Sequence, residues 1–175
     1  LDLADHLRTI VPAYADGGAA PSTVVSPLTT FAVTYAAWLR AQAPAGELAA
    51  QWAAAAGVIA AWSGVADVAT TAPLAPGEIT GDATADRYGL ILVGLSQLAY
   101  RASTQGGGDA GSFATAMDSM RIVTVLELDL ADGCLDGKAG AAPLAYGGTQ
   151  RPGDQALRLD LASAIAAYLR DPARD

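Results

Sequence analysis

The chain is poor in the residues that most often carry chemistry: its 175 residues include one cysteine and one histidine, and only 16% are charged. The single cysteine, Cys134, excludes an intrachain disulfide. The single histidine, His6, argues against a catalytic zinc site, because such sites usually take two or three histidine ligands. No segment repeats at the period of a solenoid protein.

Basic residues are also scarce, since 10 lysines and arginines stand against 18 acidic residues and the formal net charge is −8. Nucleic acids and anionic membranes are repelled by such a charge, and no basic stripe with interleaved aromatics is present, so we expect no nucleic-acid partner. The uncharged run of residues 48–66 is about as long as a membrane span. Its alanines, glycines, Gln51 and Ser63 indicate a buried helix instead, and we expect no membrane span in this chain.

Alanine supplies much of the apolar share of 52%, which favours closely packed helices with small contact residues. We predict an all-α fold, a single helical domain over residues 1–175 that forms a bundle of five to six helices. Apolar spacing places these helices at residues 1–14, 26–42, 47–62, 82–103, 112–132 and 154–169. Two long irregular loops are expected at residues 64–81 and 134–153.

Local signals fix several helix ends. Ser26 followed by Pro27 is the clearest, because serine caps the first turn and proline loses no hydrogen bond at the first helical position. Asp82 or Thr84 is the expected cap of a later helix. Gly133 is predicted to end a helix in the left-handed conformation. Gly57 lies inside a helix and lowers helix stability by about 1 kcal/mol relative to alanine, so we expect another helix to approach closely there. Ser112 and Asp154 are the remaining predicted caps.

Three segments together resemble a known module. They are Val-Ser-Pro-Leu-Thr-Thr at 25–30, Asp-Val-Ala-Thr-Thr-Ala-Pro-Leu at 67–74, and Asp-Leu-Ala-Asp-Gly-Cys-Leu-Asp-Gly-Lys at 129–138. Their order is similar to an all-helical module of large bacterial cell-surface proteins and lipoproteins, where it tends to follow immunoglobulin-like repeats. The resemblance covers about residues 24–169 and implies an extracytoplasmic, non-enzymatic surface or scaffold role. Cys134 departs from it, because an apolar residue is expected at that position.

The acidic turn at residues 129–137 is the best candidate for a site. Asp129, Asp132 and Asp136, with two glycines between and after them, supply hard oxygen ligands of the kind that Ca²⁺ prefers. The spacing differs from that of an EF-hand loop. Acids at a helix C-terminus oppose the helix dipole, so something should compensate them. An ion, Lys138 or free backbone N–H groups are the candidates, and calcium is the possible cofactor.

Other constellations carry weaker arguments. A hydrolase would need His6 beside Ser26 or Cys134, but the chain has no G-x-S-x-G elbow, and an ordinary surface histidine is the favoured interpretation. Cys134 is interpreted as a small buried hydrophobe, with a reactive thiol as the alternative. An aromatic set at helical spacing is typical of a core, with a pocket for an apolar ligand or sugar as the alternative: Tyr35, Trp38, Trp52, Trp62, Tyr88 and Tyr100.

The sequence therefore favours a non-catalytic module of a bacterial surface or secreted protein, located outside the cell or in the cell envelope. Adhesion, assembly or a scaffold role is expected, with a protein or cell-surface partner or self-association. The alternatives are a small-molecule-binding helical domain with an aromatic-lined cavity and, behind it, a hydrolase using His6. No signal peptide is evident at the first residues, so we expect a mature product or an excised fragment.

Overall fold

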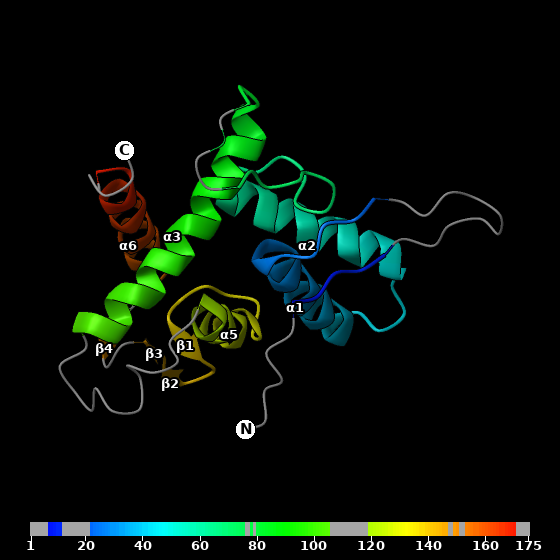
Figure 1. The fold of residues 1–175 in the computed structure, drawn as a ribbon. Helices are drawn as coiled ribbons and strands as arrows, with labels where there is room; N and C mark the ends of the chain where they lie inside the picture. Colours follow the sequence, from blue (N-terminus) through cyan, green and yellow to red (C-terminus); the bar gives the residue numbers. More distant parts are fainter. Residues whose placement is uncertain are drawn as a thin grey trace. The chain divides into compact units, whose positions relative to one another are not determined.

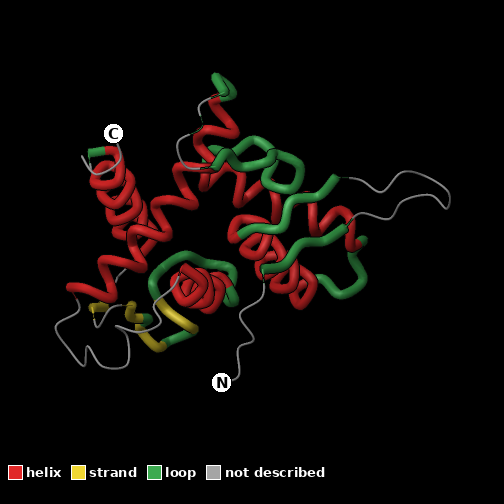
Figure 2. Tube along the Cα trace, in the orientation of Figure 1, coloured by secondary structure: helices red, strands yellow, loops and turns green. Residues whose placement is uncertain are grey.

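The structure is a computed structural model that describes residues 7–11, 22–75, 78, 80–105, 119–146, 149–150 and 153–170. These residues are mostly helical, which confirms the predicted helical class (Figures 1 and 2). The described helices are α1 (Pro27–Gln42), α2 (Leu48–Ser63), α3 (Ala83–Gln105), α5 (Ser119–Leu130) and α6 (Gly153–Leu169). The bundle arrangement and a sixth helix remain predictions, and the predicted cap Ser112 lies outside the described residues.

The chain divides into two compact units. The N-terminal unit extends to Tyr88 and contains α1, α2 and the first turns of α3, whereas the C-terminal unit begins at Gly89 and contains the rest of α3, α5 and α6. Each unit has its own buried apolar side chains and is described by itself below. The expectation of a single domain stays a prediction.

In the N-terminal unit, α1 begins as its sequence predicts. The Ser26 hydroxyl accepts from the Thr29 N–H at 3.3 Å, and the Thr29 hydroxyl accepts from the Ser26 N–H at 2.9 Å. This capping box pairs two N–H groups that the first helical turn leaves without partners. The sequence left Asp82 or Thr84 as the cap of the later helix α3. The structure shows Asp82 in this role, because its carboxylate accepts from the N–H groups of Thr84 and Ala85.

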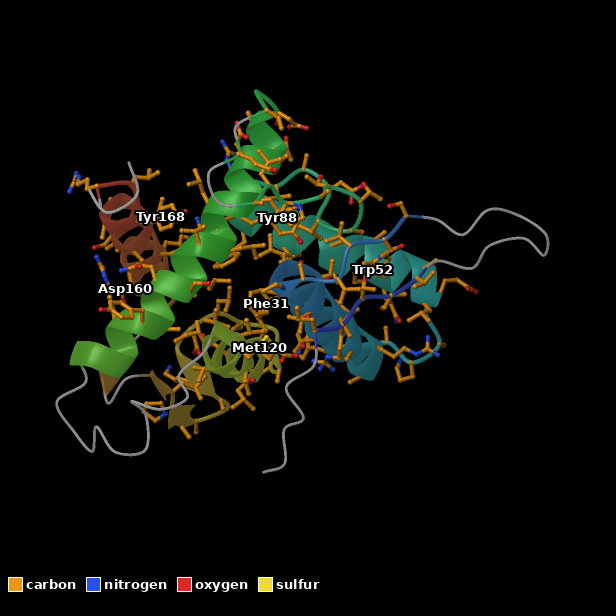
Figure 3. The ribbon with its side chains drawn as sticks, viewed as in Figure 1. Phe31, Trp52, Tyr88, Met120, Asp160 and Tyr168 are labelled. Carbon is orange, nitrogen blue, oxygen red and sulfur yellow. The ribbon has the colours of Figure 1, made fainter. Side chains whose placement is uncertain are left out.

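The first two helices pack side by side and form the core of this unit (Figure 1). Phe31 of α1 and Trp62 of α2 meet edge to face, with ring centroids 6.4 Å apart, which is a favourable aromatic geometry. Figure 3 shows that Phe31, Trp52 and Tyr88 come from three different helices. All three are at least 92% buried, so these aromatic side chains are core residues.

The prediction of a buried α2 is wrong for half of the helix. Its inner side, comprising Gln51, Trp52, Ala55 and Ile59, is buried, but the opposite side is exposed to solvent. Gly57 lies on that exposed side, and a Cβ added there would meet no atom within 4 Å. None of the other described helices therefore approaches Gly57 closely, and the expectation of such an approach is wrong for this part of the chain.

The prediction of a helix over residues 1–14 is also wrong for residues 7–11, the part of this range that the structure describes. Residues 7–11 form no regular secondary structure, and the other residues of this prediction lie outside the described part of the chain. The N–H of Arg8 donates to the Thr30 hydroxyl at 2.7 Å, and its guanidinium donates to Thr34 at 3.0 Å. The segment thus pairs with α1, 22 residues away, instead of making the local bonds of a helix.

In the C-terminal unit, α3 and α6 approach closely at Gly94. A Cβ added to Gly94 would lie 2.6 Å from Leu161 Cδ1 and 2.8 Å from Ile165 Cγ1, distances that real Cβ atoms do not tolerate. Arg101 of α3 adds hydrogen bonds to the hydroxyl and the carbonyl of Ser163, both at 3.1 Å. Gly94 is thus the glycine required by helix packing.

The segment that follows α5 is more regular than predicted. Two antiparallel hairpins interrupt the expected loop of residues 134–153: β1 (Lys138–Ala139) with β2 (Ala142–Pro143), and β3 (Ala145–Tyr146) with β4 (Thr149–Gln150) (Figure 2). Gly140, in the two-residue turn between β1 and β2, has a φ of 60° and so supplies the left-handed backbone that such turns favour. The last helix begins at Gly153, which places Asp154 inside its first turn rather than at the cap.

Gly57 of α2 and Gly94 of α3 give a matched test of this packing. We expect Gly57→Ala to raise the free energy of unfolding by about 0.5–1 kcal/mol, because alanine has the higher helix propensity and Gly57 has free space. Gly94→Ala has the same intrinsic gain, but overpacking against Leu161 and Ile165 should lower the free energy of unfolding by about 1–3 kcal/mol. Urea unfolding of dilute protein measures both. Equal effects of the two substitutions would contradict the packing described here.

Candidate functional site

The acidic turn after α5 places its three carboxylates on backbone N–H groups. Asp129, near the end of α5, is 94% buried, and one of its oxygens accepts from the N–H groups of Asp136 and Gly137 at 2.9 and 3.0 Å. The second oxygen lies 3.2 Å from the Gly137 nitrogen. One buried side chain thus holds a stretch of backbone seven and eight residues away.

The other two acids of the turn make shorter-range bonds. Asp132 accepts from the N–H of Cys134 at 3.1 Å, and Asp136 accepts from the N–H of Lys138 at 3.0 Å. The Lys138 ammonium also lies 3.4 Å from Asp136, in an exposed ion pair. Gly133 and Gly137 have φ angles of 87° and 80°, so the predicted left-handed Gly133 is confirmed and the backbone can curl around the carboxylates.

These contacts compensate the unfavourable interaction between the acidic side chains and the helix dipole that the sequence indicated. Backbone N–H groups compensate Asp129 and Asp132, and Lys138 pairs with Asp136 further along the chain, so two of the three candidates are present. No group of three or more His, Cys, Asp or Glu side chains among the described residues lies together in a way that could hold a metal ion. An ion at this turn would therefore have to draw the carboxylates Asp129, Asp132 and Asp136 together. The calcium site stays a prediction.

Burial dominates the ionisation of Asp129. Removal from water raises the pKa of this carboxyl above its usual value, and the nearby Asp136 raises it further, while the hydrogen bonds from Gly137 and Asp136 oppose the shift. A carboxylate that accepts several N–H donors is stabilised in its charged form. Here desolvation is the larger effect, so the folded chain holds the Asp129 proton more tightly than the unfolded chain does.

A second polar cluster lies in the N-terminal unit and joins two of the three segments that carry the resemblance. The Tyr88 hydroxyl is fully buried, forms a short hydrogen bond with the Ser26 hydroxyl and lies 3.3 Å from the Val68 carbonyl oxygen. Beside it, the Val24 N–H donates to the Ala69 carbonyl at 2.7 Å. Burial raises the pKa of Tyr88 and its bond with Ser26 opposes the shift.

Asp67 organises the turn next to this cluster. Its carboxylate accepts from the N–H groups of Ala69 and Thr70 and from the Thr70 hydroxyl, the last at 2.6 Å. The hydroxyl of Thr70 is the largest influence and lowers the pKa of the Asp67 carboxyl. An aspartate that binds the backbone two and three residues ahead is a standard way to fix a turn.

The remaining candidate residues are placed as follows. His6 lies outside the described residues. Cys134 is a free thiol and is exposed, so the prediction of a buried cysteine is wrong. Cys134 lies just after the turn that ends α5, where its N–H donates to the Asp132 carboxylate, and not on the buried side of a helix. Ser26, offered as the partner of His6, is 97% buried and caps α1.

The aromatic set contributes mainly to packing. Tyr35 and Trp38 of α1 contact one another in a tilted arrangement with ring centroids 5.2 Å apart, and Trp62 meets Phe31 edge to face. Tyr88 is buried, whereas Tyr100 on α3 is 61% exposed. The indole N–H of Trp62 is buried and has no hydrogen-bond partner among the residues that the structure describes. None of the described helices is long and apolar enough to cross a membrane.

Comparisons of the chain with models of known protein families, with curated proteins and with solved structures found no match. The similarity to the bacterial surface module therefore rests on the three segments themselves.

Sequence reasoning missed the role of Tyr88, which it placed only among the aromatics of a helix. The cluster joins residues that are 20 and 62 positions from Tyr88 along the chain. A buried tyrosine usually needs a hydrogen-bond partner for its hydroxyl, and that requirement was the signal available in the sequence.

The role of Asp129 is tested by the pH dependence of stability. Its raised pKa means that its contribution is fully present below about pH 3.9, where the unfolded carboxyl is also protonated, and is lost as the pH rises through the folded pKa. Asp129→Asn does not titrate. We therefore expect the wild-type chain to lose stability relative to Asp129→Asn as the pH rises from about 3.5 to 7 in parallel urea titrations.

Truncation at the same position tests the hydrogen bonds. Asp129→Ala leaves the N–H groups of Asp136 and Gly137 without their acceptor and should lower the free energy of unfolding by about 1–3 kcal/mol. Asp132→Ala is the matched control, because it removes one exposed bond and should change stability by less than about 1 kcal/mol.

In the pH titrations, a relative stability of wild type and Asp129→Asn that does not vary with pH would argue against the raised pKa of Asp129.

The calcium prediction has a direct test in the thermal melt of chelated protein. Calcium at about 100 times its dissociation constant adds roughly 2.7 kcal/mol to the stability of the native state, which should raise the midpoint by several degrees. Asp136→Asn should remove that rise if the carboxylates bind the ion, because it deletes one ligand charge. A midpoint that is unchanged by millimolar calcium would end the calcium prediction and leave the carboxylates to the backbone.

Proposed function

We propose that the chain is a non-catalytic, extracytoplasmic module of a bacterial surface or secreted protein, with a role in adhesion, assembly or scaffolding. The proposal rests on the three segments at 25–30, 67–74 and 129–138. One observation supports it most: polar side chains in all three bind backbone groups of their own unit. These side chains are Ser26, Thr29, Thr30, Asp67, Asp129, Asp132 and Asp136.

This use of polar groups is that of a scaffold. A catalytic group needs its polar atoms directed at a reacting molecule, with a base or an acid in reach. The hydroxyls and carboxylates of the three segments instead cap helices and fix turns, which holds the chain in shape. With a net charge of −8, the partner is expected to be a protein or a cell surface that is not itself strongly acidic.

The exposed thiol allows the location to be tested. In intact bacteria that produce the parent protein, a membrane-impermeant maleimide should label Cys134, because this thiol is exposed and is the single cysteine of the chain. Cys134→Ser is the control for labelling elsewhere in the parent protein. Labelling of Cys134 only after cell lysis would contradict an extracytoplasmic location.

The non-catalytic part of the proposal needs a separate test. Purified chain, assayed against ester, peptide and glycoside substrates, should show no turnover above the buffer rate. A reproducible activity that His6→Ala abolishes would support the hydrolase alternative and overturn this part of the proposal.

A further inference from the structure

The exposed side of α2 is apolar from end to end. We call it the outer face of α2: Leu48, Ala49, Ala50, Ala53, Ala54, Gly57, Val58 and Ala61, all of them exposed. Leu48 is 54% exposed and Val58 is 42% exposed. The two polar residues of this helix, Gln51 and Ser63, lie outside this face, and α2 contains no charged residue. A continuous exposed apolar surface of this kind marks an interaction site.

Gly57 gives an independent reason to expect a partner. It lies near the middle of the outer face, where glycine lowers helix stability by about 1 kcal/mol relative to alanine. Nothing in the described part of the chain requires its lack of a side chain, since an added Cβ would meet none of the described atoms within 4 Å. With small residues at the contact, a second helix can approach to the short end of the usual 8–10 Å interaxial range.

The central positions of the face are symmetric about the middle of the helix: Ala50, Ala53, Ala54, Gly57, Val58 and Ala61. We infer that the outer face of α2 binds the same face of a second copy of this chain, with the two helices antiparallel about the midpoint between Ala55 and Ala56. In that register Ala54 of one copy lies opposite Gly57 of the other, and Ala50 lies opposite Ala61. A twofold pair of this kind uses one surface patch on both copies, which is the commonest form of self-association.

Charges at the two ends of α2 favour this register. Glu47, at the N-terminal end, is exposed and makes no side-chain capping bond. At the C-terminal end, the exposed Arg87 donates to the carbonyl oxygen of Gly64 at 2.8 Å. Antiparallel pairing places Glu47 of each copy opposite Gly64 of the other, next to its Arg87. A parallel pair would bring like charges together at both ends.

The expected complex is weak. A helix of 16 residues spans about 24 Å, and one pair of such faces buries less than the roughly 1,200 Å² of a standard stable interface. We therefore expect a concentration-dependent dimer with a dissociation constant of about 10 µM or weaker. This inference does not depend on the proposed location or role.

Sedimentation velocity of the whole chain, from about 5 µM to about 1 mM, is the test. The weight-average mass should rise from that of one copy toward that of two. Ala54→Glu places a charge at the centre of the outer face and should weaken association by more than about 10-fold, because burying an unpaired charge is unfavourable. Ala37→Glu is the matched control: it makes the same change at an exposed position of α1 and should leave association unchanged.

The register is tested by charge reversal. Glu47→Arg should weaken the dimer by about 3- to 10-fold, and Glu47→Arg combined with Arg87→Glu should restore it. Circular dichroism confirms that each variant keeps its helix content. A wild-type chain that stays monomeric up to about 1 mM, or association that survives Ala54→Glu, would overturn the inference. Failure of the double variant to recover would overturn the antiparallel register.

Discussion

The buried hydroxyl of Tyr88 is the contact on which the N-terminal unit depends. It lies between the Ser26 hydroxyl, which caps α1, and the carbonyl of Val68, in the turn that follows α2. Three segments far apart in the sequence thereby meet at one polar atom inside an apolar core. Because an unsatisfied buried polar group is costly, these partners fix one arrangement of α1, the 65–70 turn and the start of α3. The surrounding apolar side chains pack the core, and the hydrogen bonds of the Tyr88 hydroxyl select one arrangement of these segments.

The features that the sequence predicted well are those that depend on neighbours within four residues. The cap at Ser26, the left-handed Gly133 and the helical class all follow from such local chemistry. Residues 7–11 show where local reasoning fails, because their apolar spacing is helical but Arg8 finds its partner in Thr30. Gly57 and Gly94 show the same limit, since only the packing of α3 against α6 distinguishes Gly94 from Gly57.

The acidic turn was predictable as a place where charge needed compensation, but the compensating group was not. Asp129 lies seven residues before Asp136, and whether a chain folds back over that distance depends on the burial of α5 and on Gly133 and Gly137. The same three carboxylates could bind a cation or could accept hydrogen bonds from backbone N–H groups, and the sequence does not distinguish these two roles. Cys134 is exposed in the segment after α5, and apolar patterning carries no information about that exposure.

The acidic turn has a practical consequence for covalent coupling of this chain to a surface. Lys138 is the only lysine in the chain, Cys134 is the only cysteine, and both are exposed within five residues of one another. Coupling through either side chain therefore attaches the chain through the same segment, residues 134–138. A surface coated in this way would hold each copy through the segment at residues 134–138, with the N-terminal unit left unmodified at its side chains.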